Sequence, residues 1–332
     1  MLKKGILLLI VGILLASAAF VGCAEDDDEA GREFLNITTA TTGGTYYPMG
    51  TGLATLWTDE MEGINVSAQS SAGSVENVDI LRGGEAELAI MQGLIGAMAL
   101  EGAGPFDEPY EDWYAITNLW PNVEHFVLEE GAVETGTAAD IEGLRFSVGP
   151  SGSGTERSTI TIMEGLGLCH EEDIDAEFLG YDEAATEIRD GGLDGASMVA
   201  GDPVPAVQDL MASPVDVEVL DFTDEQLEDI NDVWPVWARY LVEEGVYSGY
   251  EQDIETIAQP NWLAVTDEVE DEVVYELTRL IFEETDYLMD VHAAAGYIDF
   301  DTAFDGVPVK IHPAAVEYYE EQGVEVPEEL MP

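Results

Sequence analysis

Two glycine-rich turns are the segments of this chain with the clearest capacity for chemistry. The first, residues 41–48, reads TTGGTYYP, and the second, residues 149–156, reads GPSGSGTE. Each follows a short apolar run and precedes a helical pattern, so each is expected to connect a strand to a helix. The first N–H groups of a helix have no partner within the helix and can bind an anion. Two such turns predict that two lobes hold a small acidic ligand between them.

The residue types in these turns suit an anion that is held without a cation. Glycine lets the backbone approach a ligand closely, and serine and threonine hydroxyls add neutral donors. The candidate contacts are Thr42, Gly44, Thr45 and Tyr46 in the first turn and Ser153, Gly154 and Thr155 in the second. The alternative is that both are ordinary strand-to-helix turns that bind no ligand.

Other polar residues lie where ligands collect in open α/β sheets. Gln92 and Pro203 each follow the end of an expected strand. Ser74 and Asn77 lie at the start of an expected helix, where they could contact the ligand or only cap the helix. Arg157 follows the second turn and could pair with a ligand carboxylate or with another side chain of the protein.

The sequence offers little support for catalysis or metal binding. Cys169 and His170 are adjacent in the chain, and adjacent side chains do not generally face each other. The four histidines lack the spacing of metal ligands. Neither glycine turn matches a P-loop, and the chain has no Gly-x-Ser-x-Gly elbow. We therefore expect a binding protein that has no metal, no cofactor and no enzymatic activity.

The N-terminus has the pattern of an export signal. Lys3 and Lys4 precede an apolar run over residues 6–21, which is short for a membrane span and typical of a signal peptide. The run ends in Gly22-Cys23, which resembles a lipobox in which the cysteine is lipidated. The prediction is a lipoprotein signal over residues 1–23, with Cys23 anchoring the chain to the outer face of the cytoplasmic membrane. An uncleaved anchor helix is the alternative.

The charge of the chain is extreme. Its 70 acidic and 10 basic residues give a formal net charge of -60. Self-repulsion of this size opposes a compact fold unless salt screens it, which predicts an exported protein of a salt-loving cell. The same charge argues against a nucleic acid as partner. Residues 24–33 are acidic and lack a cluster of apolar side chains, so they are expected to form a tether.

The order of the expected elements predicts an α/β fold in which one βαβ plan is used twice. Lobe I would comprise residues 34–126 and 259–332, and lobe II residues 127–258. Two crossings of the chain between the lobes would then form a hinge. The expected strands are residues 34–39, 65–69, 87–91, 144–148, 176–179, 196–200 and 261–265, and the expected helices are residues 49–61, 74–82, 156–166, 182–189, 268–289 and 313–322.

At these motifs the sequence resembles a known family, the TAXI solute receptors of tripartite ATP-independent periplasmic (TRAP) transporters. The strongest matches are TGGTYYP at residues 42–48, GSVEN at residues 73–77, and residues 149–156 and 201–208. The resemblance implies a type II periplasmic-binding-protein fold and delivery of a solute to a membrane permease driven by an ion gradient. It also implies an organic-acid ligand, with glutamate or 2-oxoglutarate as the candidates.

The resemblance assigns ligand contacts to particular residues of this chain. They are Thr42, Tyr46, Ser74, Asn77, Gln92, Ser153, Gly154, Thr155, Pro203 and Tyr247. The sequence departs from the family at Ala72, where the family often has glycine, and at Gln92-Gly93, where a polar and acidic ending is common. Two other functions stay open: a sensor subunit that presents a ligand to a membrane kinase, and an exported hydrolase with a serine nucleophile.

Overall fold

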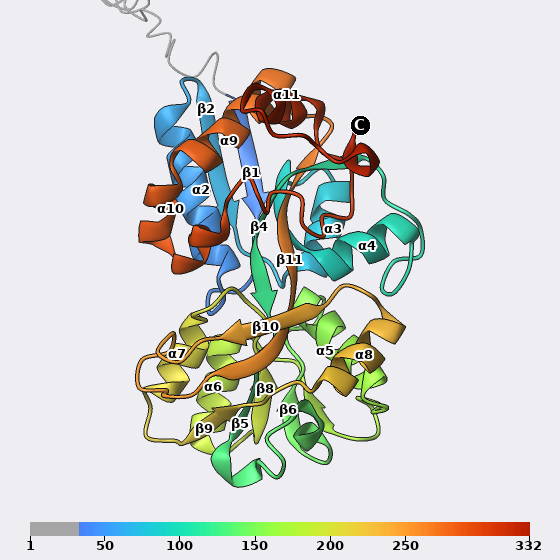
Figure 1. Ribbon diagram of the computed structural model, residues 1–332, viewed down its shortest axis with the longest axis vertical. Helices are drawn as coiled ribbons and strands as arrows, with labels where there is room; N and C mark the ends of the chain where they lie inside the picture. The colour runs from blue at the N-terminus through green and yellow to red at the C-terminus, as the bar shows by residue number, and fades with distance from the viewer. Residues whose placement is uncertain (1–32) are drawn as a thin grey trace, which may run out of the picture. The chain divides into compact units, whose positions relative to one another are not determined.

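The computed structural model describes residues 33–332, which form two β-sheets with helices around them (Figure 1). The predicted lipid signal, with Cys23, lies outside the described residues, as does the predicted tether up to residue 32. None of the helices in the described part is both long and apolar enough to cross a bilayer.

The larger sheet has the strand order β10-β11-β3-β1-β2, and β4 pairs with β11. Strand β1 runs parallel to β3, whereas β11 runs antiparallel to β3, β4 and β10. The strands are β1 (Glu33–Thr38), β2 (Ile64–Gln69), β3 (Leu88–Gln92), β4 (Trp113–Val123), β10 (Ala238–Val242) and β11 (Ile254–Thr266). The associated helices are α2 (Tyr46–Glu60), α3 (Ser74–Arg82), α4 (Gly93–Glu101), α9 (Asp271–Glu283), α10 (Thr285–Val291) and α11 (Pro313–Glu321).

The smaller sheet has the strand order β7-β6-β8-β5-β9. Strand β6 is parallel to β7 and β8, and β5 is antiparallel to β8 and β9. The strands are β5 (Phe126–Glu129), β6 (Arg145–Ser147), β7 (Asp175–Glu177), β8 (Gly195–Ser197) and β9 (Val217–Val219), and the helices are α5 (Gly154–Gly165), α6 (Tyr181–Asp190), α7 (Pro205–Met211) and α8 (Asp224–Val233).

The two sheets share one topology. The order β2-β1-β3-β11-β10 in the larger sheet corresponds to β7-β6-β8-β5-β9 in the smaller one. The central pairs β1–β3 and β6–β8 are both parallel, and the pairs that follow them are antiparallel in both sheets. The prediction of one βαβ plan used twice is confirmed. Because the carboxyl ends of parallel strands lie at one edge of a sheet, each set of helix starts gathers at one edge.

The chain passes between the sheets twice, first from β4 to β5 and again through residues 220–237, which connect β9 to β10. Only Glu124 and His125 separate β4 in the larger sheet from β5 in the smaller one. The Glu124 N–H donates to the Ile257 carbonyl of β11 at 2.9 Å, so the first passage lies beside this strand. In Figure 1, β4 and β11 both extend from the upper half toward the lower half.

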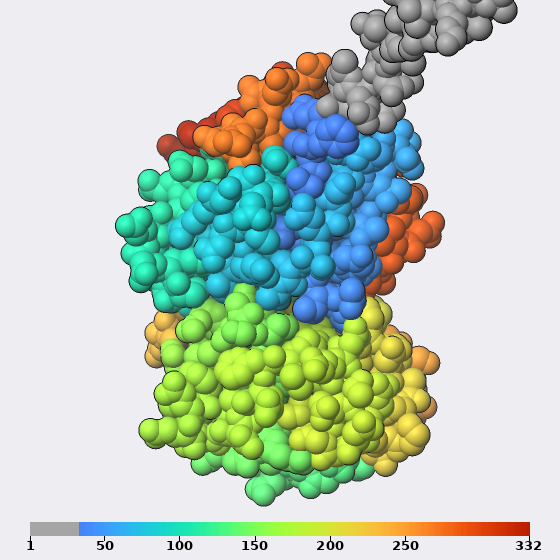
Figure 2. All heavy atoms as spheres, turned by 180° about the vertical axis from the view of Figure 1, so that it is seen from behind, coloured from blue at the N-terminus to red at the C-terminus, as the bar shows by residue number. Residues whose placement is uncertain are grey.

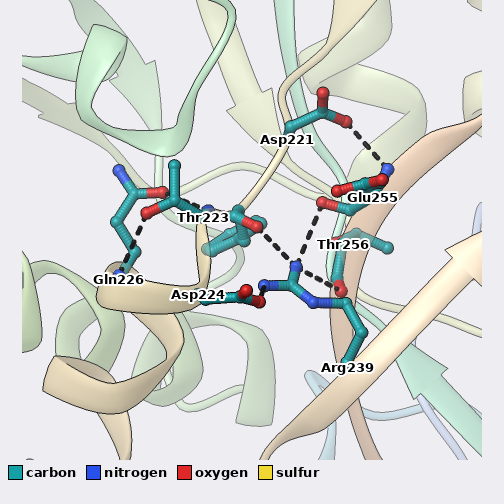
Figure 3. A network of polar contacts seen from close by, with 8 residues as sticks. Asp221, Thr223, Asp224, Gln226, Arg239, Glu255 and Thr256 are labelled. Carbon is teal, nitrogen blue, oxygen red and sulfur yellow. Dashed lines mark hydrogen bonds and ion pairs between the residues drawn. The ribbon is translucent and has the colours of Figure 1, made fainter.

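A polar network centred on Arg239 braces the second passage (Figure 3). The guanidinium of Arg239, on β10, donates to the Phe222 and Thr256 carbonyls and pairs with Asp224 at 2.8 Å. Nearby, the Glu255 N–H donates to the Asp221 carboxylate at 2.8 Å. Arg239 thus ties the segment before α8 to the paired strands β10 and β11.

The core is continuous through the larger sheet and its helices. Trp57 on α2, Trp120 on β4 and Trp262 on β11 are fully buried. The indole N–H of Trp57 donates to the Leu277 carbonyl of α9 at 3.3 Å, which fixes the first helix against the late one. The late strand and helices therefore complete the same sheet that the first strands begin.

The prediction of one continuous helix over residues 268–289 is wrong, because the structure has two helices there. Helix α9 ends at Glu283 and α10 begins at Thr285, with Glu284 at φ -112° and ψ 28° between them. The Thr285 hydroxyl donates to the Ile281 carbonyl at 3.1 Å, which satisfies an acceptor at the end of α9. Sequence reasoning also missed α4, α7, α8, β9 and β10.

Candidate functional site

A cavity of about 30 Å³ lies where the two glycine turns meet. Segments of both halves of the molecule line it, where one half is built on the larger sheet and the other on the smaller sheet. Each turn ends at the start of a helix, and this start faces the other half. On the face shown in Figure 2, atoms of the two halves touch along their boundary. The lining residues are Ala40, Thr41, Gly44, Thr45, Tyr46, Ala72, Gly73, Ser74, Gln92, Pro150, Ser153, Gly154, Thr155, Tyr181, Val199 and Ala200.

Most of the predicted contact residues line this cavity, and the others lie outside its lining. The predicted residues in the lining are Gly44, Thr45, Tyr46, Ser74, Gln92, Ser153, Gly154 and Thr155. The predicted residues outside the lining are Thr42, Asn77, Arg157, Pro203 and Tyr247.

Four helix N-termini converge on the cavity. Tyr46 begins α2, Ser74 begins α3, Gly154 begins α5 and Tyr181 begins α6, and all four residues line the cavity. The first N–H groups of each helix have no acceptor within the helix, and the helix dipole adds partial positive charge there. The Ser153 side chain accepts from the Glu156 N–H at 2.9 Å and leaves its own proton for another acceptor. The arrangement concentrates donors around a small space.

Gln92 supplies a further donor. Its side chain is 3% exposed, and its Oε1 accepts from the Ser158 hydroxyl at 3.5 Å. Its Nε2 has no hydrogen-bond partner within residues 33–332, and the residue lines the cavity. The Ser74 Oγ accepts from the Gln92 backbone N–H at 3.1 Å, which fixes the end of β3 against the start of α3.

The lining carries no formal charge. Its two tyrosines are neutral, because burial raises the pKa of Tyr46 and of Tyr181 well above the ordinary value. The Tyr46 hydroxyl donates to Asn261, and the Tyr181 hydroxyl donates to the Val199 carbonyl at 2.7 Å. Arg157 is half-buried on α5 beyond the lining and makes no ion pair within the described part of the chain. An anion here would be stabilised by dipoles alone.

Direct hydrogen bonds also join the two halves. The exposed Thr42 hydroxyl donates to the Asp182 carboxylate of α6 at 3.0 Å. The Thr45 hydroxyl donates to the Gly201 carbonyl at 2.8 Å, and the Glu76 N–H donates to the Gly152 carbonyl at 3.0 Å. These bonds place the molecule in a closed arrangement, in which Thr42 contacts the opposite half rather than the cavity.

Tyr247 and Pro203 are not part of the cavity lining. The Tyr247 hydroxyl accepts from the Val204 N–H at 3.0 Å and shares a hydrogen bond with His125 Nε2 at 2.8 Å. Burial lowers the pKa of His125 to about 4, so its ring is neutral at pH 7. These contacts hold the segment after β8 in place without reaching the cavity.

Asn77 holds strands together. Its Oδ1 accepts from the Thr38 hydroxyl at 2.8 Å, and its Nδ2 donates to the Thr39 and Ile90 carbonyls at 2.8 and 3.0 Å. It therefore bridges α3 to the ends of β1 and β3 below the cavity.

We expect Asn77→Ala to lower the free energy of unfolding by about 2–4 kcal/mol, because it leaves buried donors and acceptors without partners. Denaturant unfolding followed by circular dichroism measures this loss. Glu76→Ala, on the same turn of α3 but exposed, is the matched comparison. Equal stability of Asn77→Ala and wild type would contradict the structural role.

Among the lining residues that were not predicted as contacts, Tyr181 has the largest polar side chain. It begins α6, and its hydroxyl lies 2.6 Å from the Thr155 hydroxyl. A signal was present in the repeated plan, because α6 in the second βαβ set corresponds to α3 in the first, and Ser74 begins α3. Within the described residues, no group of three or more histidine, cysteine, aspartate or glutamate side chains could hold a metal ion.

Solved structures resemble this chain in fold. The ligand-binding component of an ABC-type import system from Staphylococcus aureus, solved with zinc bound, has a TM-score of 0.50 and 9% identity, with 91% of this chain and 97% of that chain covered. A putative L-cystine ABC transporter protein from Listeria monocytogenes gives 0.49 and 10%, with coverage of 82% and 98%. The periplasmic aliphatic sulphonate-binding protein of Escherichia coli gives 0.44 and 14%, with coverage of 90% and 96%.

The first of these likenesses shows that the chain has the α/β fold of a solute-binding component, as predicted. Family membership comes from the sequence itself. The sequence model of the NMT1-like family matches residues 37–323, which is most of the chain. The protein therefore belongs to the NMT1-like family.

Proposed function

We propose that this protein is an extracytoplasmic solute receptor that captures a small organic acid and delivers it to a TRAP-type membrane permease. The observation that carries the proposal is the uncharged, donor-rich cavity formed by both glycine turns. The solute-binding fold and the NMT1-like family support a receptor. The permease class rests on the resemblance of the turn motifs to TAXI receptors, and membrane anchoring rests on the lipobox at Cys23.

The chemistry of the lining favours a carboxylate that has no ammonium group. Helix N-termini, the Ser153 hydroxyl and the Gln92 amide all offer hydrogen to an acceptor. No aspartate or glutamate lines the cavity to pair with an amino group. Burial of an unpaired ammonium is costly, so we propose 2-oxoglutarate in preference to glutamate.

The size of the cavity implies that the halves separate before a ligand enters. A buried water molecule needs at least about 10–15 Å³ of cavity volume, so a cavity of about 30 Å³ holds only a few waters. An organic acid would enter an open form in which residues 34–126 and 259–332 move apart from residues 127–258. The passage at Glu124, beside Ile257, and the passage through residues 220–237 would serve as the hinge.

We expect isothermal titration calorimetry in molar salt to detect binding of 2-oxoglutarate, with weaker binding of glutamate. Ser153→Ala should weaken binding by about tenfold or more, because it removes a donor to a charged group. Ser151→Ala is the matched control, since Ser151 is exposed in the same turn and outside the lining. Equal affinity of Ser153→Ala and Ser151→Ala would exclude the mapped contact. Failure of a panel of dicarboxylates to bind would exclude the acid ligand.

A sensor subunit that presents the ligand to a membrane kinase would use the same cavity. Co-purification with a multi-span permease, rather than with a kinase, distinguishes the two partners. A serine hydrolase is not proposed, because the Ser153 Oγ accepts a backbone N–H and no described histidine or carboxylate contacts it.

A further inference from the structure

A buried carboxyl group lies at the passage between the two halves. Glu124 is 0% exposed and stands between β4 and β5. Its N–H donates to the Ile257 carbonyl at 2.9 Å, and its carbonyl accepts from the Thr256 hydroxyl at 2.6 Å. The backbone of Glu124 is therefore fixed to β11.

The carboxyl has neutral partners only. Its Oε1 accepts from Trp237 Nε1 at 2.9 Å and from Gln259 Nε2 at 3.4 Å. Its Oε2 has no hydrogen-bond partner within the described residues. Burial of the ionised carboxylate without a cation costs much free energy. Burial of the protonated carboxyl costs less, because only one neutral oxygen-bearing group, at Oε2, then lacks a hydrogen-bond partner. Burial accordingly raises the pKa of Glu124 to about 8 from an ordinary value of 4.5, although both hydrogen bonds oppose the change.

The titratable groups around Glu124 are also neutral. His125, the next residue, is held uncharged by burial, and the Tyr181 phenol on α6 interacts with the carboxyl electrostatically. The segments that contact it from β11 and from the start of β10 present Thr256, Gln259 and Trp237. No arginine, lysine or second carboxylate contributes to the shift at Glu124.

A chain of side chains connects this carboxyl to the cavity. The same Gln259 Nε2 donates to the Ser158 hydroxyl of α5 at 2.8 Å, and Ser158 lies 3.5 Å from Oε1 of the cavity residue Gln92. The Gln259 Oε1 accepts from the Leu94 N–H at 2.9 Å, which fixes its orientation. Ser158 belongs to the half with the smaller sheet, whereas Gln259 and Gln92 belong to the larger sheet. Separation of the halves would therefore remove Ser158 from Gln259 and open a path for water toward Glu124.

We propose that Glu124 is a proton-binding site in the hinge, and that closure of the halves over a ligand takes up a proton at this carboxyl. The inference rests on the proposed function, because it assumes that the halves close to capture a ligand. In the open form water stabilises the ionised carboxyl, and in the closed form the proton stays bound. The pH window lies between the pKa of Glu124 in the open form and its pKa of about 8 in the closed form. Within this window a lower pH favours closure, and the equilibrium constant for closure rises by at most tenfold per pH unit, because one proton is bound.

The first experiment measures closure without a ligand. The full chain, with Cys23→Ser and Cys169→Ser, carries spin labels at Glu62→Cys and Glu171→Cys, which are exposed positions in the two halves. Pulsed dipolar EPR should show a larger closed fraction at pH 6 than at pH 9. Glu124→Gln, which mimics the protonated group, should remove this dependence, whereas Glu129→Gln at an exposed site should retain it. The same pH dependence in Glu124→Gln and wild type would overturn the proposal.

A second variant guards against a folding defect in Glu124→Gln. Trp237→Phe removes the indole donor that stabilises the ionised form, so the midpoint of the pH dependence should move upward by about one unit. An unchanged midpoint in a folded Trp237→Phe protein would count against Glu124 as the titrating group.

The second experiment uses 2-oxoglutarate as probe. Calorimetry in two buffers of different ionisation enthalpy should give uptake of up to one proton at pH 7, and affinity should fall at least tenfold from pH 6 to pH 9. Glu124→Gln should show neither effect. Failure of 2-oxoglutarate and other acids to bind, with pH-dependent closure intact, would refute the proposed ligand and leave the proton site standing. Binding with no proton uptake in wild type would refute the proton site and leave the receptor function standing.

Discussion

Replacement of Gly154 by alanine is expected to prevent closure of the two halves. A Cβ atom at this position would lie 2.1 Å from Gln92 Oε1 and 2.6 Å from its Cδ, far inside van der Waals contact. Gln92 is almost fully buried on the opposite half, so its amide has little room to move aside. The clash exists only when the halves meet, and opening relieves it. We therefore expect at least a hundredfold loss of affinity for the acid, with little change in the stability of each half.

Calorimetry and small-angle X-ray scattering measure the affinity and the closure of Gly154→Ala. Gly180→Ala is the matched control: it makes the same chemical change at the start of α6, where a Cβ atom would meet Thr41 Cγ2 at an ordinary 3.7 Å. If Gly154→Ala closed like the wild type, the contact between Gly154 and Gln92 would not be part of the closed cavity.

Dilution of salt is expected to unfold this protein. The chain has a formal net charge of -60, and the described residues contain few ion pairs: Arg145–Asp194, Arg239–Asp224, Arg279 with Glu276 and Glu283, and the distant His312–Asp271 pair. Exposed pairs of this kind each contribute at most about 1 kcal/mol. Repulsion among the remaining carboxylates extends about 10 Å in 0.1 M salt but about 3 Å in 1 M salt. The helical circular dichroism signal should therefore fall cooperatively below roughly molar salt.

A titration from about 3 M to about 10 mM sodium chloride, followed at 222 nm, tests this expectation. Sucrose at matched water activity is the control, because it favours compact states without screening charge. A full helical signal in dilute buffer would show that packing alone overcomes the repulsion. Rescue by sucrose to the same extent as by salt would show that screening is not the cause.

Local signals in the sequence predicted many of the elements that build the site. Helix α3 begins at Ser74 and ends at Arg82 as predicted, and the predicted Gly-Gly pair follows its last residue. The predicted capping is wrong: the N-cap is Gly73, without a side-chain capping bond, and the Ser74 Oγ instead accepts from the Gln92 N–H. The two glycine turns do precede helices. The alternation of strands and helices along the sequence correctly predicted parallel strands in each of the two sheets. The break between α9 and α10 could not be predicted, because one amphipathic pattern continues through Glu284, whereas in the structure the Glu284 backbone leaves the helical conformation.

Membership of the cavity was only partly predictable. The backbone conformation of a turn is local, so the glycine and hydroxyl residues of both turns could be named in advance. The direction of a side chain depends on what packs against it, and for Thr42 and Asn77 that partner comes from elsewhere in the chain. Thr42 contacts Asp182, and Asn77 contacts Thr38 and the end of β3.

The sequence by itself determined that this chain has two glycine-rich turns that precede helices, a duplicated α/β plan and a strongly acidic composition. Only the tertiary structure decided that the turns face one cavity, that Tyr181 lines the cavity, and that Glu124 is buried without a cation. In a chain with 70 acidic residues no local pattern distinguishes one glutamate from another. The distinction arises from desolvation, which depends on segments that meet only when the two sheets pack together.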